Sequence, residues 1–592
     1  MENRAEKNYG RVFDLMDNYV AKYDLPDVLA NKVNGEYIKY SAKAFQENAN
    51  AISHGLVKLG INKNDKVAVI SPNRPEWNFI DLGVQQIGGV LVPMYPTITI
   101  EDYKFIFKDA GVKIIFVANE DLYKKVNLAI KDIEGIEAVF TFDEVENARN
   151  WNEVKKLGSE GKQTDLDKLK EAVSTDDLLT LIYTSGTTGN PKGVMLSHGN
   201  VMSNVENVIA MIPVSEGEKA LSFLPLCHIY ERTVLYIYMR LGVAIYYAES
   251  MDTIIVNINE VKPHTFTSVP RLLEKVYDKI VSKGMEQKGL KKKIFFWAVN
   301  LGLKYDPMQN MGFLYDLQLK VARKLIFSKW KAALGGNIKV ISSGSAALQP
   351  RLLRIFWAAG IPISEGYGLT ETSPVLTTSC VDPINLQIGT VGVVIPSVEI
   401  KIAEDGEILA KGPNIMKGYY NRPDLTAEVI DKDGWFHTGD IGEFRDGKYL
   451  KITDRKKEIF KTSGGKYVAP QGIENKLKES LFIEQAVVVG EGQKFPSAIV
   501  ALNFEAVRAF CEENEINYTT DAEMIMNKKV IDKIEEEVKI INKNIAQYEQ
   551  VKKIRLLPQL MTIEGGELTP TLKLKRKAIG AKYEKLIGSM YE

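Results

Sequence analysis

Apolar runs alternate with helix-like spacing through the first half of the chain. Residues 66–71 (KVAVIS), 88–95 (GGVLVPMY) and 112–118 (VKIIFVA) have the apolar character of buried strands, and residues 50–60 (NAISHGLVKLG) have the spacing of an amphipathic helix. Strands that alternate with helices in this way form parallel sheets with helices on both faces. The pattern therefore predicts an α/β fold for this part of the chain.

The pattern changes near residue 274. Residues from about 274 to 333 have helical spacing and many lysines, with bulky side chains between the charges, as in residues 290–302 (LKKKIFFWAVNLG) and 320–334 (KVARKLIFSKWKAAL). Two interpretations stay open. The segment is either a surface helical insertion with an apolar inner face, or a peripheral contact with an anionic membrane, which basic residues beside exposed aromatic residues would favour.

Short strand-like pieces with many glycines follow from about residue 389 to residue 454 and predict a β-rich subdomain. The charged junction at residues 454–457 (DRKK) precedes a last region with its own strand and helix signals. We therefore expect a large N-terminal domain of parallel-type sheets and helices over residues 1–454, and a small, mobile α+β domain over residues 455–592.

Composition limits the classes of function. The chain has 592 residues, too many for one compact core, with 45% hydrophobic and 26% charged residues, as in ordinary globular proteins. Lys+Arg and Asp+Glu are both 76, so the net charge is zero and nucleic acid is not an expected partner. The longest apolar stretch, residues 234–248, contains Arg240 and is expected to be a buried helix or strand pair rather than a membrane span.

The three cysteines are far apart and form no CxxC pair, which argues against a disulfide framework or a cysteine zinc site and fits a reducing compartment. The N-terminus has no apolar segment typical of a secretory signal.

We expect a cytoplasmic protein, with a peripheral contact at the inner face of a membrane as an open alternative. Oligomeric state stays open.

The strongest local signal is residues 178–200 (LLTLIYTSGTTGNPKGVMLSHGN), an apolar strand that ends in a loop of Gly, Ser and Thr followed by a lysine. Glycines let backbone N–H groups approach an anion closely, and hydroxyls and a lysine add donors and positive charge. This chemistry suits a nucleotide triphosphate, although the spacing is not that of a Walker motif. The candidate phosphate-binding residues are Thr184, Ser185, Gly186, Thr187, Thr188, Gly189 and Lys192.

This string resembles the phosphate loop of the adenylate-forming superfamily, which includes acyl-CoA synthetases, peptide-synthetase adenylation domains and beetle luciferases. Three further motifs match in the same order over nearly the whole chain: residues 342–348 (SSGSAAL), 365–374 (EGYGLTETSP) and 434–474 (GWFHTGDIGEF and its continuation). The resemblance implies that ATP and AMP are bound by Gly344, Ser345, Ala346, Glu365, Gly366, Tyr367, Gly368 and Thr370, together with Asp440 and Arg455.

The residue chemistry agrees with these implied roles. Tyr367 lies between two glycines, so that its ring can stack on a flat base, and Thr370 can donate to the α-phosphate. Glu371 supplies the hard oxygen ligands that Mg²⁺ prefers, and we place the metal at Thr184 and Glu371. Asp440 can accept both ribose hydroxyls.

The form of residues 435–440 (WFHTGD) and 450–457 (LKITDRKK) resembles that of fatty acyl-CoA synthetases, whereas peptide-synthetase domains usually carry a Tyr-Arg-Thr-Gly-Asp form. The helical insertion is also similar to that of the long-chain branch. His228, in residues 224–232 (LPLCHIYER), falls in the segment that lines the acyl side in this family. A lone histidine is often structural, so its role at the carboxylate is a hypothesis.

Residues 568–577 (LTPTLKLKRK) resemble the segment that carries the adenylation lysine, which the match places at Lys573. The usual glycine before that lysine is replaced by Leu572, so Lys575 remains an alternative. Lys457 matches the hinge of the family. The resemblance further implies that the C-terminal domain rotates to present Lys461, Gly464, Gly465 and Lys466 for the step that uses coenzyme A.

The sequence thus predicts an ATP-dependent, Mg²⁺-dependent ligase that converts a medium- or long-chain fatty acid to an acyl-adenylate and then to acyl-CoA. Lys573, Thr184, Glu371 and His228 are the expected catalytic residues. Two alternatives stay open: a ligase that loads an acyl carrier protein, and a catalytically inactive fatty-acid-binding protein at a membrane.

Overall fold

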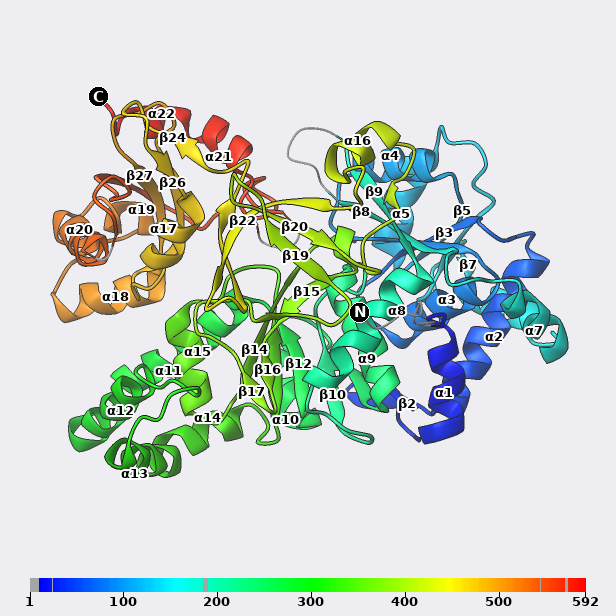
Figure 1. The fold of residues 1–592 in the computed structure, drawn as a ribbon. Helices are drawn as coiled ribbons and strands as arrows, with labels where there is room; N and C mark the ends of the chain where they lie inside the picture. Colours follow the sequence, from blue (N-terminus) through cyan, green and yellow to red (C-terminus); the bar gives the residue numbers. More distant parts are fainter. Residues whose placement is uncertain (1–9, 24, 185–189, 544, 570–572) are drawn as a thin grey trace.

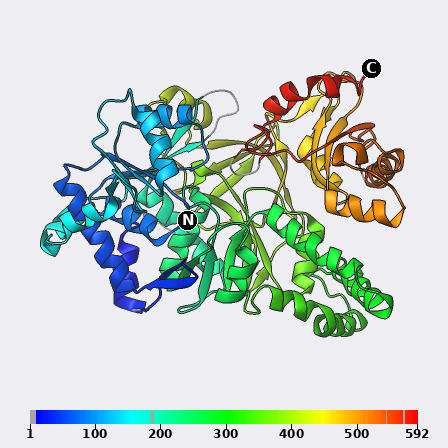
Figure 2. The same ribbon diagram turned by 180° about the vertical axis from the view of Figure 1, so that it is seen from behind.

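The computed structural model describes the whole chain except residues 1–9, 24, 185–189, 544 and 570–572 (Figure 1). Two large sheets and their helices make up the N-terminal part, and a separate group of strands and helices, orange to red in Figure 1, forms the C-terminal part. Seen from behind, the same C-terminal group stands above the green helices of the middle of the chain (Figure 2). The α/β class with a smaller α+β C-terminal unit is therefore confirmed.

The eight-stranded sheet has the strand order β21-β9-β8-β4-β3-β5-β6-β7. Its parallel centre matches the apolar runs, because β3, β4 and β5 coincide with the three predicted strands. The strands are β3 (Lys66–Ile70), β4 (Val90–Met94), β5 (Val112–Val117), β6 (Ala138–Thr141), β7 (Arg149–Asn150), β8 (Leu178–Thr184), β9 (Lys192–Ser197) and β21 (Gly418–Tyr419).

The second sheet has thirteen strands in the order β19-β20-β22-β23-β18-β15-β14-β13-β12-β10-β11-β1-β2. Strands β1, β10, β11, β12, β13 and β14 pair in parallel, and the strands from β15 to β19 along the order pair antiparallel. Their bounds are β1 (Leu29–Val33), β2 (Glu36–Tyr40), β10 (Lys219–Ser222), β11 (Ala244–Tyr247), β12 (Thr265–Ser268), β13 (Val340–Ser343), β14 (Ile363–Gly368), β15 (Val375–Thr378), β18 (Val393–Val394), β19 (Glu399–Ile402), β20 (Glu407–Lys411), β22 (Phe436–Arg445) and β23 (Tyr449–Arg455).

The strands expected as a β-rich subdomain thus continue the parallel sheet rather than form a sheet of their own. The change of direction occurs at β14 and β15, where the pairing shifts register between Tyr367 and Gly368. A Cβ atom at Gly368 would lie 1.7 Å from the backbone oxygen of Pro374, so only glycine fits this close approach. The turn brings the motif at residues 365–371 to the carboxyl ends of the parallel strands. The domain boundaries themselves stay predictions.

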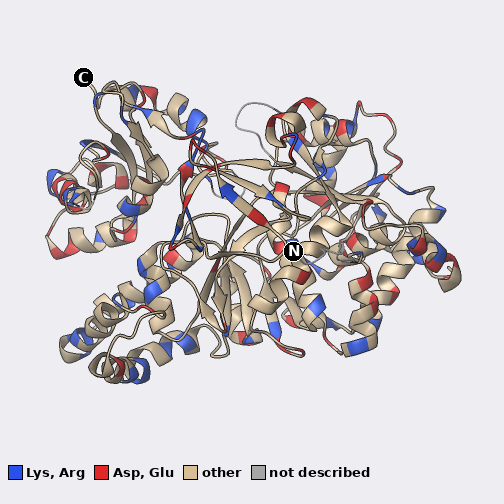
Figure 3. Cartoon of the chain, viewed as in Figure 1, with Lys and Arg blue, Asp and Glu red and all other residues tan. Residues whose placement is uncertain are grey.

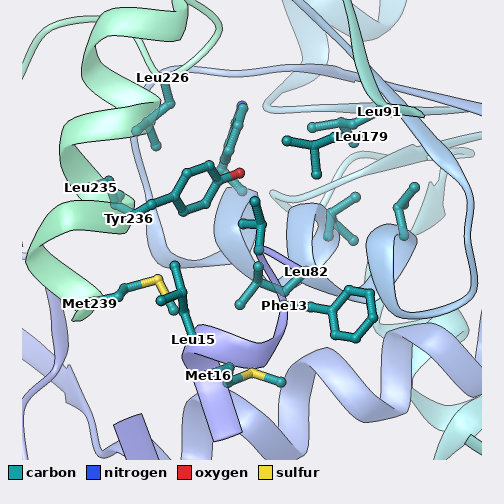
Figure 4. Packing of buried hydrophobic residues seen from close by; sticks show 14 of the residues in the cluster. Phe13, Leu15, Met16, Leu82, Leu91, Leu179, Leu226, Leu235, Tyr236 and Met239 are labelled. Atoms are coloured by element: carbon teal, nitrogen blue, oxygen red, sulfur yellow. The ribbon is translucent and has the colours of Figure 1, made fainter. Parts of the chain in front are cut away.

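Helices cover both large sheets, and one extensive core cluster lies between helices and strands of both sheets, with separate clusters on other faces. In Figure 4, Leu235 and Met239 of α9 face Leu15 and Met16 of α1, with Leu82 of α3 nearby. The helices of this part are α1 (Asp14–Tyr23), α2 (Ala42–Lys58), α3 (Pro75–Gln86), α4 (Ile100–Ala110), α5 (Glu120–Ile130), α6 (Trp151–Gly158), α7 (Gln163–Glu171), α8 (His198–Val208), α9 (Ile229–Leu241), α10 (Ile254–Val261), α15 (Pro350–Ala358) and α16 (Pro423–Val429).

The apolar stretch at residues 234–248 is divided between the end of α9 and strand β11, both buried in the N-terminal part. Its Arg240 lies near the end of the helix and pairs with Glu206 at 2.7 Å. Among the residues that the structure describes, no helix combines the length and the apolar character needed to cross a bilayer.

The lysine-rich segment folds as four helical pieces at one edge of the molecule: α11 (Pro270–Met285), α12 (Gly289–Gly302), α13 (Phe313–Ala322) and α14 (Ser328–Ala333), with a π-helical turn, η2 (Arg323–Phe327), between the last two. Figure 1 shows α12 and α13 at the outer tip, away from both large sheets. Phe295, Phe327 and Trp330 are buried against α15, which confirms an apolar inner face.

The C-terminal part is built on a three-stranded sheet in the order β26-β27-β28. Its core includes Val488, Val500 and Leu502 from the strands, packed against helices. The elements are β24 (Phe460–Lys461), β25 (Tyr467–Val468), α17 (Pro470–Leu477), β26 (Ile483–Val489), β27 (Ser497–Leu502), α18 (Phe504–Glu513), α19 (Asp521–Met524), α20 (Lys528–Asn542), β28 (Lys553–Leu557), α21 (Arg576–Lys582) and α22 (Glu584–Gly588).

Candidate active site

The glycine-rich loop joins two paired strands. Thr184 ends β8 and lies opposite Lys192, the first residue of β9, in the antiparallel register. The ammonium of Lys192 lies 4.9 Å from the centroid of the Tyr419 ring, on the short strand β21 that pairs with β9. The predicted phosphate-binding residues Ser185, Gly186, Thr187, Thr188 and Gly189 lie outside the described residues.

Tyr419 also contacts the predicted metal ligand. Its hydroxyl donates to Oε1 of Glu371 at 2.9 Å, and the backbone of Glu371 is held by the N–H of Met416 at 2.8 Å. Thr370 and Glu371 lie on the short 3₁₀ turn η3 (Thr370–Thr372), directly after β14. The sequence did not single out Tyr419, because it is 48 positions from Glu371 and belongs to none of the recognised motifs.

The described residues contain no group of three or more His, Cys, Asp or Glu side chains able to hold a metal. A Mg²⁺ ion that arrives with a nucleotide needs only one or two protein carboxylates, because phosphate oxygens and water complete its shell. The carboxylate of Glu371 and the hydroxyl of Thr184 at the end of β8 are hard oxygen donors of the right kind. The donor set therefore fits Mg²⁺ bound through a triphosphate.

A second polar group joins side chains from β14, β22 and β23. The hydroxyl of Tyr367 donates to Oδ2 of Asp440 at 2.7 Å, and Nε of Arg455 lies 3.5 Å from Oδ1. Asp440 and Arg455 are direct partners in the strand register. Burial raises the pKa of Asp440 above its usual value, and the charge of Arg455 opposes that rise. The carboxyl group of Asp440 thus has one hydrogen-bond donor, Tyr367, and one positively charged neighbour, Arg455.

Glu365 lies deeper in the same motif. Burial raises the pKa of its carboxyl to about 8, although the backbone N–H of Leu348 opposes the shift. Leu348 ends the predicted adenine-side loop, so this contact joins the second and third motifs. Gly366 and Gly368 flank Tyr367 on β14, as the sequence indicated.

The loop with Gly344, Ser345 and Ala346 follows β13. The N–H of Gly344 donates to the carbonyl of Ser268 at 3.3 Å, and a Cβ atom at Gly344 would lie 3.2 Å from Cζ of Tyr230. Ser345 has a positive φ of 70°. The hydroxyl of Tyr230 also donates to the carbonyl of Ser342, on β13, at 2.9 Å. Tyr230 therefore shapes this loop, although the sequence gave it no role.

His228 caps the N-terminus of α9. Its Nδ1 accepts the N–H of Tyr230 at 3.2 Å, so the neutral ring carries its proton on Nε2. Burial, together with the nearby positive charge of Lys573, lowers the pKa of His228 to about 4. The imidazole is therefore uncharged at neutral pH. The influence of Lys573 also brings a residue of the C-terminal part to the acyl-side candidate.

Lys573 lies among the charged groups of the large sheets. Burial lowers the pKa of its ammonium to about 8, and Arg455 acts in the same direction, whereas Asp440 and Glu371 oppose the shift. Its backbone is held by Thr569, which accepts the N–H of Lys573 through Oγ1 at 3.0 Å. Lys575, the sequence alternative, is exposed. The structure thus brings Lys573, rather than Lys575, into the same site as Asp440, Glu371 and His228.

A half-buried arginine anchors the Lys573 segment. Arg576 donates to both oxygens of Glu474 at 2.8 Å and to Glu458 at 2.8 Å. Glu458 directly follows Lys457, the exposed residue at the predicted hinge. Arg576 therefore joins the chain after the hinge to the chain after Lys573. No sequence signal separated Arg576 from the other basic residues around it.

The loop expected to serve the coenzyme A step is exposed. Lys461 ends β24, and the N–H of Thr462 donates to the carbonyl of Lys466 at 2.9 Å, which closes a turn around Gly464 and Gly465. Lys461 and Lys466 are exposed, whereas Lys573 is half-buried. In this structure the C-terminal part presents Lys573, not this loop, to the large sheets.

Comparison with known proteins gives the following relationships. The AMP-binding enzyme family matches residues 20–420, and the AMP-binding enzyme C-terminal domain matches residues 457–592. The long-chain-fatty-acid–CoA ligase FadD15 of Mycobacterium bovis is 32% identical over 579 residues, covering 96% of this chain and 95% of its own. Long chain acyl-CoA synthetase 4 of Arabidopsis thaliana is 32% identical over 622 residues, covering 98% and 91%. The solved structure of a Mycobacterium tuberculosis fatty acyl CoA synthetase has the same fold, with a TM-score of 0.63, 20% identity, and coverage of 97% and 99%.

Proposed function

The chain belongs to the AMP-binding enzyme family, and from this premise we propose that it activates a medium- or long-chain fatty acid with ATP and transfers the acyl group to coenzyme A. The observation that carries the proposal is the position of Lys573. A lysine from the C-terminal part is half-buried and lies within electrostatic reach of Asp440, Glu371 and His228, which belong to three different motifs of the N-terminal part. Sequence relatives named as long-chain fatty acid ligases over almost the whole chain support the substrate class.

In the first step, an oxygen of the fatty acid carboxylate attacks the α-phosphorus of ATP, and the bond to the pyrophosphate oxygen breaks. Negative charge develops on the phosphoryl oxygens, so catalysis depends on positioning and on charge stabilisation. We assign this stabilisation to the ammonium of Lys573 and to the hydroxyls of Thr184 and Thr370. Asp440 would accept the ribose hydroxyls, with Tyr367 and Arg455 holding its carboxylate. Lys192 and the loop beyond Thr184 would bind the phosphates.

Mg²⁺, held through Glu371 and Thr184, would neutralise charge on the phosphate oxygens when it is bound. Tyr419 supports this assignment, because its hydroxyl donates to one oxygen of Glu371 and orients the carboxylate. His228 is neutral and carries a proton on Nε2, so it would donate to the substrate carboxylate without adding charge to the site.

In the second step, the thiolate of coenzyme A attacks the acyl carbon, the bond to the phosphate oxygen breaks, and AMP leaves. The loop with Lys461, Gly464, Gly465 and Lys466 would serve this step after the C-terminal part rotates about Lys457. A single small unit that carries residues for both steps requires such a rotation, because Lys573 occupies the site in the present orientation.

A small apolar cavity supports an aliphatic substrate. Ile258 of α10, Phe266 of β12, Ile341 of β13 and Phe356 of α15 line it. Phe266 is two positions from Ser268, which contacts the Gly344 loop, so the cavity lies roughly 7 Å below the strand ends. The cavity has room for about one water molecule in this structure, so an acyl chain that enters from the strand ends would have to widen it as the chain runs between the sheet and these helices.

The test is AMP release with fatty acids of graded length, with ATP, Mg²⁺ and either coenzyme A or acyl carrier protein as acceptor. We expect release that requires all components, with coenzyme A as the acceptor and acetate as a poor substrate. If acetate or an aromatic acid had a higher specificity constant than every fatty acid, the fatty-acyl assignment would be wrong. A cytoplasmic location with a peripheral contact at the inner face of a membrane stays a prediction.

A further inference from the structure

Helix α13 and the π-helical turn η2 carry a row of exposed apolar side chains. Phe313 is 80% exposed, Leu314 74% and Leu317 52%, and Val321 and Leu325 continue the row. Residues three or four apart on a helix lie on the same side, so these five side chains cover one face of the helical run. We call this face the α13 stripe. Soluble proteins seldom leave such a contiguous apolar face open unless it binds something.

The helix is fixed with this face outward. On its opposite side, Leu319 and Ala322 are buried in the core of the insertion, and Phe327 of η2 is buried in the same core. The hydroxyl of Tyr315 donates to the carbonyl of Leu301 at 2.7 Å, and Nε of Arg323 donates to the carbonyl of Ala358 at 2.8 Å. These contacts prevent the helix from rotating about its own axis, so the α13 stripe stays on the outer surface of the protein.

Positive charge gathers around the α13 stripe. Residues 287–334 contain ten Lys or Arg residues and only two Asp, although the whole chain has zero net charge. Lys320 and Lys324 directly precede Val321 and Leu325 and flank the stripe. Both are exposed, and within the described part of the chain neither forms an ion pair with a carboxylate. In Figure 3, blue segments gather at the tip formed by α12 and α13.

We propose that the α13 stripe is a docking surface for an anionic lipid bilayer, which takes up the apolar side chains while Lys320 and Lys324 remain at the headgroups. A helix with an apolar face and flanking lysines binds in this way at a membrane interface. A second copy of this chain is a poorer occupant, because a symmetric pair would bring the same lysines together.

The position of the stripe indicates what docking would achieve, and this step of the inference rests on the proposed function. The helical run that begins at Phe313 continues through α14 to Leu334, which lines the apolar cavity assigned to the acyl chain. Ile255 of α10 also lines this cavity and is exposed at the surface. Docking through the stripe would therefore hold the cavity close to the phase in which a long-chain fatty acid dissolves.

The test is co-sedimentation of the full chain with vesicles, without ATP, coenzyme A or fatty acid. One set of vesicles is phosphatidylcholine, and the other is phosphatidylcholine mixed with anionic phosphatidylglycerol. We expect binding to the anionic vesicles that weakens as salt is added, because exposed charges are screened. Absence of binding to the anionic vesicles at low salt overturns the inference and leaves the proposed function untouched, because no substrate is present.

Two double variants test the stripe itself. Phe313→Ser with Leu317→Ser removes apolar area, and Lys320→Glu with Lys324→Glu reverses charge, and each should weaken binding by about tenfold or more. The matched controls are Leu128→Ser on α5 and Lys528→Glu with Lys529→Glu on α20, which change exposed residues elsewhere and should bind like the natural chain. AMP release with detergent-dispersed fatty acid should stay unchanged in both stripe variants, which shows that they fold.

Two results would count against the stripe. If both stripe variants bound vesicles as well as the controls, another surface would be responsible. If the natural chain were dimeric by light scattering and the serine double variant were monomeric, the occupant would be a second copy of the chain rather than lipid.

Discussion

Nη2 of Arg271 donates to Oε1 of Glu484 at 2.9 Å, although 213 residues separate them in the chain. Arg271 lies on α11 and Glu484 on β26, so this ion pair joins the N-terminal part to the C-terminal part. Nearby, Gln349 and Arg351 both donate to the backbone carbonyl of Lys478. Arg271 and Glu484 lie outside the recognised motifs, and together these contacts hold the orientation in which Lys573 lies in the site.

The first prediction concerns this ion pair. Glu484→Gln should slow formation of the acyl-adenylate by about two- to fivefold, because a partly exposed pair contributes less than about 1 kcal/mol. Conversion of supplied acyl-adenylate to acyl-CoA should not fall, since that step uses the other orientation. Pyrophosphate release and thioester formation measure the two steps. The control is Arg508→Gln, which breaks an exposed pair with Asp521 inside the C-terminal part and should leave both rates unchanged.

The second prediction separates Lys573 from Lys575. Lys573→Ala should lower acyl-adenylate formation by about 10²–10³, the usual cost of removing one preorganised donor from developing charge. Lys573→Ala should still convert supplied acyl-adenylate to acyl-CoA. Lys575→Ala is the matched control, because this lysine is exposed and two positions away. A large loss in Lys575→Ala with little loss in Lys573→Ala would reverse the assignment.

The third prediction follows from the pKa of Lys573, which burial lowers to about 8. The protonated ammonium is the form that stabilises negative charge, and it is lost as the pH rises through this pKa. We therefore expect kcat/KM for ATP, measured by pyrophosphate release, to fall above about pH 8, since kcat/KM reports the free enzyme. In Lys573→Arg the fall should disappear, because a guanidinium stays protonated throughout this range. An unchanged fall in that variant would assign the titration to another group.

The sequence was sufficient for the fold class and for the family, because the strand pattern is local and the motifs are contiguous. It also named Lys573, Asp440, Glu371 and His228 in separate motifs. It left open which lysine enters the site, because Leu572 replaces the usual glycine. The structure favours Lys573, because it is half-buried near the charges of Asp440 and Glu371, whereas Lys575 is exposed.

Contacts between distant segments were not predictable. Tyr419 reaches Glu371 only because β21 pairs with β9, and two residues of strand give no signal in a sequence. Arg576 belongs to a basic run in which every residue has the same apparent role until the fold brings Glu474 and Glu458 to it. Such pairs depend on tertiary packing, which residue spacing along one segment does not determine.

The fourth prediction concerns Tyr367, whose hydroxyl donates to Asp440. Tyr367→Phe removes a hydrogen bond to a charged group, which is worth about 1.5–3 kcal/mol. We expect the KM for ATP to rise by about tenfold or more, with a smaller change in the KM for the fatty acid. Tyr449→Phe is the control, because its hydroxyl donates to Asn385 away from the site. Equal changes in both KM values would indicate a structural role for Tyr367 rather than one in binding the nucleotide.

The last prediction tests the rotation between the two steps. Lys457 is exposed in the turn between Arg455 and Phe460, and in the described structure its N–H donates no hydrogen bond to another residue. Lys457→Pro therefore removes no contact of the present orientation, but it fixes φ and restricts the residue before it. We expect acyl-adenylate formation to survive and thioester formation to fall by at least about tenfold, because the rotation requires a change of backbone angle at the hinge. Lys457→Ala is the matched control and should leave both steps nearly unchanged.

Lys466→Ala, in the exposed loop, should resemble Lys457→Pro in sparing the first step and slowing the second. If Lys457→Pro lost both activities equally while its unfolding midpoint matched that of Lys457→Ala, the two steps would not be separated by rotation at this residue.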